Sequence, residues 1–107
     1  MKQTKDKGTD VLDAERILEV LDRNAERLRA YHVRKIGLFG SFLHQSATRR
    51  SDVDLLVGLD HLSFDGYMDL KFFLEDLFGR KVDLVIEEDV KPALQSVLKE
   101  AIYAEGV

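Results

Sequence analysis

The sequence predicts an α+β domain in which helical segments and strands follow one another in the order α-β-α-β-α-β-α. Three observations predict this order: apolar residues recur at helical spacing in three long segments, short stretches rich in Val, Ile and Leu separate them, and Gly or Pro marks the boundaries. The 107 residues, 45% of them hydrophobic and 34% charged, suit one globular domain. We therefore expect a disordered tail over residues 1–9 and a single domain over residues 10–107.

The first half of the domain is expected to contain one long helix and one strand. Residues 10–31 carry apolar side chains at helical spacing, and Thr9 or Asp10 can cap the helix. Residues 33–39 favour a strand that ends at Gly40-Ser41, and residues 42–48 form a short helix or a loop. The apolar helical positions are Ala14, Ile17, Leu18, Leu21, Ala25 and Leu28.

The second half is expected to contain two strands and two helices. Residues 51–59 and 81–86 are rich in Val and Leu and predict strands. Residues 65–78 have helical spacing, and Gly79 stops that helix. A last helix is expected to begin with Pro92 in its first turn, with an apolar face of Leu94, Val97, Leu98, Ala101 and Ile102.

Composition excludes several classes of function. The net charge of −4 gives no broad electrostatic footprint for nucleic acid, and the absence of cysteine excludes disulfides and thiolate metal sites. No apolar run approaches the ~20 residues that span a bilayer, and the polar start MKQTKDKGTD lacks the apolar core of a signal peptide. We expect a cytoplasmic protein without membrane contact, whose small core favours association with a partner or further copies.

Three aspartates lie in segments that otherwise predict buried strands. Side chains alternate across a strand, so Asp52 and Asp54 project to one face, roughly 6.5–7 Å apart along the backbone. The alternate residues, including Val53 and Leu55, face the helices. Asp83 lies in a second apolar strand, KVDLVIE. If the two strands are adjacent, three carboxylates converge on one patch, and such hard oxygen ligands suit Mg²⁺ together with substrate phosphates and water.

The turn Gly40-Ser41 fits the same chemistry. Glycine lets the backbone approach a phosphate closely, and a helix that began at Ser41 would direct free N–H groups at the anion. Two Mg²⁺ ions ~3.5–4 Å apart could then assist phosphoryl or nucleotidyl transfer. At residue frequencies of roughly 5–7% each, Gly-Ser followed after ten residues by Asp-x-Asp arises by chance in about one chain per thousand of this length.

The segment GSFLHQSATRRSDVDLLV resembles the Gly-Ser-x10-Asp-x-Asp signature of the DNA polymerase β nucleotidyltransferase superfamily. The chain length and element order are most similar to minimal nucleotidyltransferase (MNT) domain proteins, over roughly residues 11–103. The resemblance implies a small mixed three-stranded sheet flanked by helices. It also implies that Gly40 and Ser41 hold the triphosphate of ATP and that Asp52 and Asp54 bind Mg²⁺. Asp83 matches the third carboxylate, which assists metal binding and activates the acceptor hydroxyl.

The resemblance also implies a partner. MNT proteins are typically encoded beside HEPN-domain ribonuclease toxins and act as antitoxins that transfer AMP from ATP onto a toxin tyrosine. One departure concerns the family pattern GSxARG, which has Leu43, His44 and Gln45 here. Arg49 or Arg50 could replace the missing arginine at the phosphates.

Other readings of the same sequence stay open. The departure at His44 and Gln45 suits a non-catalytic antitoxin that neutralises its partner by occlusion, and a metal-dependent phosphohydrolase is a third alternative. The three histidines show no zinc spacing, although His44 lies where it could touch nucleotide. Tyr67 and Tyr103 are candidate self-modification acceptors. The aromatic residues Phe39, Phe72, Phe73 and Phe78 are expected in the core, and Glu87, Glu88 and Asp89 in a solvated turn.

Overall fold

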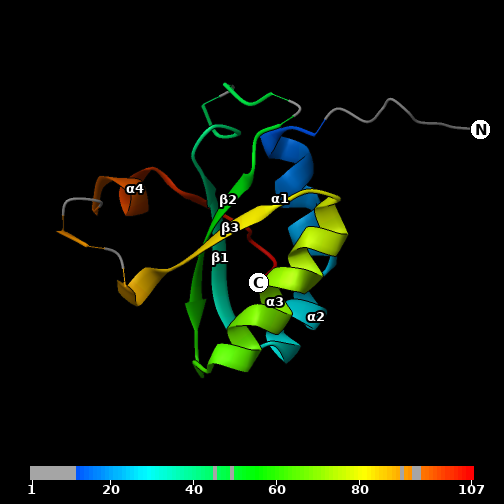
Figure 1. The fold of residues 1–107 in the computed structure, drawn as a ribbon, viewed down its shortest axis with the longest axis vertical. Coiled ribbons are helices and arrows are strands. Elements are labelled where there is room, and N and C mark those ends of the chain that lie inside the picture. The colour runs from blue at the N-terminus through cyan, green and yellow to red at the C-terminus, as the bar shows by residue number, and fades with distance from the viewer. Residues whose placement is uncertain (1–11, 45, 49, 90, 93–94) are drawn as a thin grey trace, which may run out of the picture.

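A four-stranded mixed sheet forms the centre of the computed structural model, which describes residues 12–44, 46–48, 50–89, 91–92 and 95–107 (Figure 1). The strand order is β3-β2-β1-β4; β1 runs antiparallel to β2 and β4, whereas β2 and β3 are parallel. The predicted α+β fold is confirmed. The elements in chain order are α1 (Ala14–Arg23), α2 (Ala25–Ala30), β1 (Val33–Phe39), β2 (Val53–Leu59), α3 (Phe64–Phe78), β3 (Val82–Ile86), η1 (Glu87–Asp89), α4 (Gln95–Glu100) and β4 (Ile102–Tyr103).

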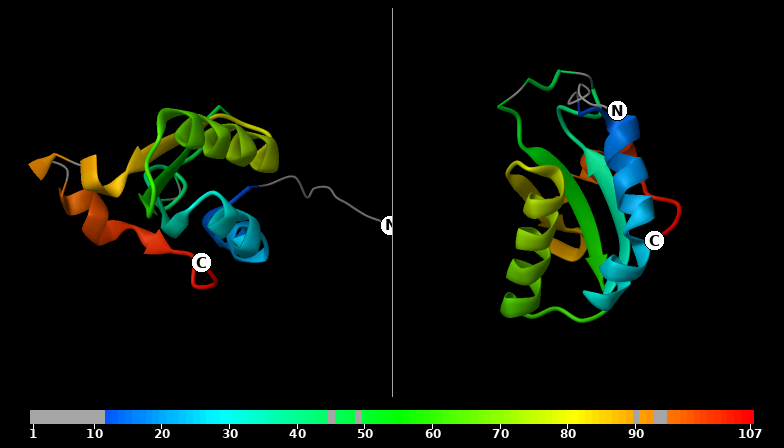
Figure 2. Two further views of the ribbon diagram at one scale, coloured as in Figure 1. Left: turned by 90° about the horizontal axis from the view of Figure 1, so that it is seen from below. Right: turned by 90° about the vertical axis from the view of Figure 1, so that its right-hand side faces the viewer.

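The core lies between one face of the sheet and a layer formed by α1, α2 and α3 (Figures 1 and 2). Alternate residues of β2 enter this core, and Val53, Leu55 and Val57 are fully buried, as the alternation predicts. They meet Ile17, Leu21, Leu28, Leu70 and Leu74 from the helices. The shorter α4 lies on the other side of the sheet (Figure 1).

The predicted helix over residues 10–31 is two helices in the described part, α1 and α2, with a break at Asn24. The Asn24 side-chain amide donates to the Val20 carbonyl at 2.8 Å, and the Asn24 backbone N–H is shared between the Val20 and Leu21 carbonyls. Asparagine competes with helical backbone bonds in this way, which periodicity alone does not reveal. Residues 1–9, expected to be disordered, lie outside the described residues.

The C-terminal prediction was partly wrong, because the chain adds a fourth strand. In the described residues the last helix is α4, and residues 102 and 103 pair with β1 as β4. Ile102 lies opposite Leu38 and Tyr103 opposite Gly37, and the Ala104 N–H continues the ladder to the Ile36 carbonyl at 2.9 Å. Ile and Tyr favour strands. A strand of two residues is too short for a periodic signal, and Leu94 lies outside the described residues.

One open alternative is decided by the structure, and one expectation needs correction. The segment over residues 42–48 is a turn in its described part, with no helix. Phe72 lies on the solvent side of α3 with 57% of its surface exposed, whereas Phe73 is half-buried against Tyr31, with ring centroids 5.2 Å apart. Among the described residues, no helix is long and apolar enough to cross a membrane.

Candidate active site

Asp54 and Asp83 lie directly opposite each other on adjacent strands. They are register partners in the parallel pair of β2 and β3, a pairing that brings backbones to about 4.8 Å. On its other side Asp54 faces Phe39, the last residue of β1. Asp52 lies one residue before β2 and is exposed. The fold therefore brings Asp54 and Asp83 together from segments 29 positions apart in the sequence, at the end of the sheet where β1 finishes.

Gly40 closes the turn against the Asp54 carboxylate. Its φ of 79° lies in the left-handed region that side chains disfavour. A Cβ atom built on Gly40 would overlap the Asp54 Oδ2 atom. The next residue, Ser41, donates a backbone hydrogen bond to the Asp54 carboxylate. Glycine is thus required at this position for both its conformation and its small size, and the turn and the acid form one unit.

The charge on Asp54 is destabilised by its surroundings. Partial burial raises the pKa of Asp54, and the neighbouring Asp83 and, more weakly, Asp52 raise it further, while the hydrogen bond from Ser41 opposes these effects. Two like charges on paired strands repel each other unless a cation lies between them. The site is therefore electrostatically suited to a cation.

The turn after Ser41 is held by its own backbone and by α4. The His44 N–H donates to the Gly40 carbonyl at 3.1 Å, and the Ser46 N–H donates to the Ser41 carbonyl at 2.9 Å. In the described part of the turn no helix begins at Ser41, so the anion-binding helix end that such a helix would provide is not formed. His44, in the position of the family's arginine, has its Nε2 atom 2.8 Å from the Glu100 Oε1 atom of α4.

Two arginines were predicted to touch phosphate. Arg49 lies outside the described residues. Arg50 is exposed in the loop before β2, where its backbone N–H donates to the Thr48 hydroxyl at 3.2 Å. No contact links the Arg50 side chain to Ser41 or Asp54 in the described part of the chain.

Arg80 joins the two halves of the site and was missed by sequence reasoning. Its guanidinium donates to the Ser51 carbonyl at 3.1 Å and lies 5.1 Å from the centre of the Phe42 ring. Ser51 precedes Asp52, and Phe42 follows Ser41, so one side chain fixes both the acidic loop and the turn. In the sequence, the one feature that could have drawn attention to Arg80 is its position three residues before Asp83.

The acidic residues do not form a complete metal site by themselves. Among the residues that the structure describes, no group of three His, Cys, Asp or Glu side chains is arranged to hold a metal ion. Magnesium is usually held by one or two carboxylates, with phosphates and water completing its octahedron. The Asp54 and Asp83 pair offers such hard oxygen donors, and their mutual repulsion would be relieved by a cation, so these residues fit Mg²⁺ brought with a nucleotide.

Residues 15–106 match the polymerase β nucleotidyltransferase family. The chain belongs to this family. The protein adenylyltransferase MntA of Thermococcus cleftensis is 36% identical over 96 residues, which cover 87% of this chain and 97% of that relative. This nucleotidyltransferase is thus similar to a protein-modifying member of its family over nearly its full length.

Solved structures support the same placement of this nucleotidyltransferase. A protein proposed to be a minimal nucleotidyltransferase is 31% identical, with a TM-score of 0.73 over 85% of this chain and 95% of that one. A toxin–antitoxin complex solved with AMP-PNP contains a chain that is 25% identical, with a TM-score of 0.66 over 80% of this chain and 73% of that one. The minimal nucleotidyltransferase fold that the sequence resemblance implied is confirmed, with one strand more than expected.

Proposed function

We propose that this nucleotidyltransferase moves AMP from ATP onto a tyrosine hydroxyl group of a HEPN ribonuclease toxin and thereby acts as its antitoxin. The observation that carries the proposal is the register of Asp54 with Asp83 beside the Gly40 turn. Membership of the family gives the reaction class. The similarity to MntA and to an antitoxin solved with AMP-PNP supports ATP as the donor and a protein as the acceptor.

Each residue takes a role from its position. The backbone of Gly40 and Ser41 receives the triphosphate, since glycine leaves this approach free of a side chain. Asp52 and Asp54 would hold Mg²⁺, with Asp83 as a further ligand, and the metal would supply positive charge against the phosphates. Arg80 keeps the loop before Asp52 and the turn after Ser41 in fixed positions.

Asp83 is placed to act on the acceptor. It is exposed on β3, the edge strand of the sheet, so a partner can approach it from solvent. In the proposed step Asp83 accepts the proton of the acceptor hydroxyl, whose oxygen bonds to the α-phosphorus of ATP. The bond from that phosphorus to the bridging oxygen breaks, and pyrophosphate leaves.

The reaction is tested with ATP labelled at different phosphates. We expect label from the α-phosphate to move onto the HEPN toxin in the presence of Mg²⁺, and label from the γ-phosphate to stay in solution as pyrophosphate. With Asp54→Ala we expect no label on the toxin. Release of orthophosphate without an acceptor would instead indicate the phosphohydrolase. Equal transfer by Asp54→Ala would refute the assignment.

The second candidate is a non-catalytic antitoxin that occludes its partner. The observation that favours it is His44, which stands where the family has arginine and contacts Glu100. A turn held in this way lacks the guanidinium at the phosphates. In this case toxin neutralisation would survive the double substitution Asp52→Ala and Asp54→Ala.

A further inference from the structure

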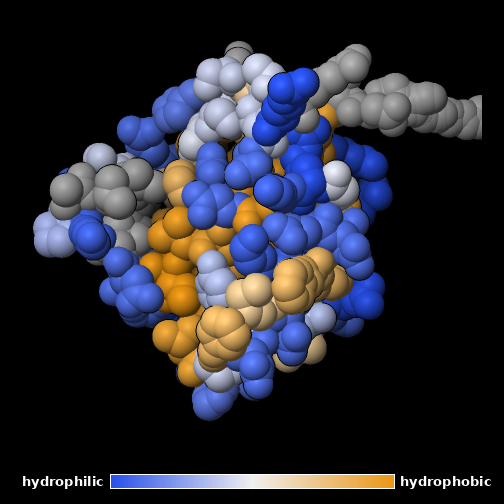
Figure 3. Space-filling model, viewed as in Figure 1, coloured by the Kyte–Doolittle hydropathy of each residue, from blue (hydrophilic) through white to orange (hydrophobic). Residues whose placement is uncertain are grey.

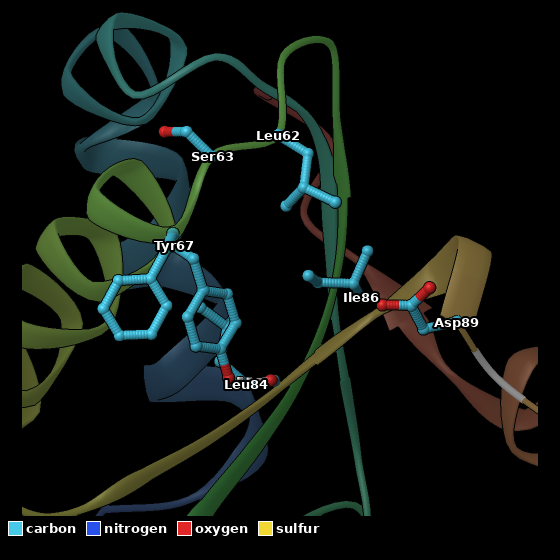
Figure 4. A pocket seen from close by; sticks show the side chains of 7 residues that line it. Leu62, Ser63, Tyr67, Leu84, Ile86 and Asp89 are labelled. Atoms are coloured by element: carbon cyan, nitrogen blue, oxygen red, sulfur yellow. Dashed lines mark hydrogen bonds between the residues drawn. The ribbon is translucent and has the colours of Figure 1, made fainter.

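A groove lies between the start of α3 and the edge strand β3, away from the Gly40 turn. We call it the α3–β3 groove; it has a volume of about 440 Å³ and is lined by Leu62, Phe64, Tyr67, Leu84, Ile86 and Asp89, together with the capping residue Ser63. Leu62, Tyr67 and Ile86 point into the same space (Figure 4). The Tyr67 hydroxyl donates to the Leu84 carbonyl at 2.6 Å and so joins α3 to β3.

Large apolar side chains of the groove are exposed to solvent, where they contribute no burial energy to the isolated chain. Phe64 is 78% exposed and Leu62 is 56% exposed. Apolar surface gathers over the edge of the sheet beside α3 (Figure 3). Tyr67 lies on the same face of α3 as the buried Leu70 and Leu74, so the groove continues the apolar face of this helix beyond the core. Contiguous apolar surface with a polar rim marks a protein interaction site.

The rim of the groove is acidic. Asp89 lies in its lining, and Asp65 follows Phe64. The nearby cation Arg34 is already paired, with Glu88 at 2.9 Å and with Asp60 at 3.4 Å. A second copy of the chain would bring the same carboxylates against this rim and be repelled. A basic partner is attracted, and a ribonuclease needs basic surface to hold RNA.

The groove borders the strand that carries Asp83. Asp83 adjoins Leu84, which lines the groove, and lies close enough to Tyr67 that its charge helps to raise the pKa of the tyrosine, after the larger effect of burial. Leu84 is buried on the helix-covered face of β3, so the exposed Asp83 side chain projects from the opposite face of this strand. The groove and the site share the edge strand.

We infer that the α3–β3 groove docks an amphipathic helix with basic flanks from the toxin. Helices commonly bind such grooves through their apolar face. The inference rests on the proposed function in taking the toxin as the partner, but it concerns binding, which is measured without ATP.

The test compares two variants by calorimetric titration with the purified HEPN toxin in the absence of nucleotide. The double variant Leu62→Ala and Phe64→Ala removes the exposed groove residues. Phe72→Ala is the matched control, because Phe72 is 57% exposed on the same helix but does not line the groove. All three side chains are exposed, so the fold is retained, which circular dichroism checks. We expect the double variant to weaken binding about tenfold or more and Phe72→Ala to leave it unchanged.

Two outcomes would overturn the inference. One is equal toxin affinity in the wild type and the double variant. The other is self-association of the wild type that the double variant abolishes while the toxin does not bind, which would make a second copy the occupant. Failure of the proposed function has a different signature. If the wild type binds the toxin through the groove but transfers no AMP, the catalytic proposal is refuted and the docking surface is retained.

Discussion

The carboxylate of Asp54 connects every part of the candidate site. It is opposite Asp83, contacts the turn at Gly40 and accepts a hydrogen bond from Ser41. Burial and neighbouring acids raise its pKa, so the folded chain holds the Asp54 proton more readily than the unfolded chain does. The geometry that suits a cation therefore reduces stability when no cation is bound.

Asp54→Asn should stabilise the fold while abolishing activity. The pKa of Asp54 is higher in the folded chain than in the unfolded chain, so the proton on Asp54 stabilises the fold. This contribution is complete below the unfolded pKa of about 4 and is lost as the pH rises through the folded pKa. The variant should therefore be more stable than the wild type at pH 7, and the two should converge below about pH 4. AMP transfer should fall about a hundredfold or more, since several kcal/mol of metal stabilisation are lost.

Urea unfolding between pH 4 and 7.5, together with transfer assays, measures both effects. The control is Asp69→Asn, because Asp69 is an exposed carboxylate of α3 outside the site. A loss of stability in Asp54→Asn at neutral pH would contradict the electrostatic account.

Gly40→Ala should damage both stability and catalysis. The left-handed conformation costs an alanine about 1–2 kcal/mol, and the new Cβ displaces the Asp54 carboxylate. A displacement near 1 Å lowers transfer about a hundredfold. Gly79→Ala is the matched control, since Gly79 also has a positive φ, 67°, but no atom lies within 4 Å of its Cβ position. Gly79→Ala should lose stability and keep its activity; parallel losses of activity in both variants would assign the Gly40 effect to folding.

At the residue scale, the sequence pattern singled out the residues to which we assign chemistry, but not the residues that hold them in position. Asp52, Asp54 and the Gly40-Ser41 turn have a spacing along the chain that identifies them. Arg80 has no such spacing, because its contacts with Ser51 and Phe42 exist only once the loops have folded together. His44 was singled out for its position, but its contact with Glu100 depends on where α4 lies.

Among the elements, β4 is the one that sequence periodicity did not predict. Its Tyr103 ring crosses Gly37 of β1, and its hydroxyl donates to the Glu87 carboxylate at 3.3 Å. The three longer strands and α3 have enough residues for periodicity to reveal them. Short elements that depend on tertiary pairing, such as β4 and the break at Asn24, do not.

Gly37→Ala should loosen β4 from the sheet. The added Cβ would lie 2.9 Å from the Tyr103 ring, and overpacking of this kind costs about 1–3 kcal/mol. Gly58→Ala is the control, because its Cβ would meet the end of the flexible Arg34 side chain, also at 2.9 Å, which can move aside. Hydrogen exchange at Ala104, whose N–H bonds to the Ile36 carbonyl, should accelerate in Gly37→Ala only. Unchanged exchange would show that β4 tolerates the methyl group.

For the whole molecule, one layer of helices covers one side of the sheet, while Asp83 lies at an edge strand that faces solvent (Figure 2). Sequence resemblance implied a fold of this kind, and a chain of a toxin–antitoxin complex shares it with a TM-score of 0.66. The proposed docking surface was not predicted. Leu62 and Phe64 are apolar like the core residues, and only the folded structure shows that they are exposed.

The most direct measurement of the central claim is whether toxin inactivation outlasts the antitoxin. The HEPN toxin is incubated with this chain, Mg²⁺ and ATP, the chain is then removed under mild denaturation, and the ribonuclease activity of the refolded toxin is measured. Covalent AMP transfer predicts a toxin that stays inactive, only when ATP was present and only when Asp54 is intact. Full recovery of ribonuclease activity after removal of the wild-type chain would contradict the account and support occlusion.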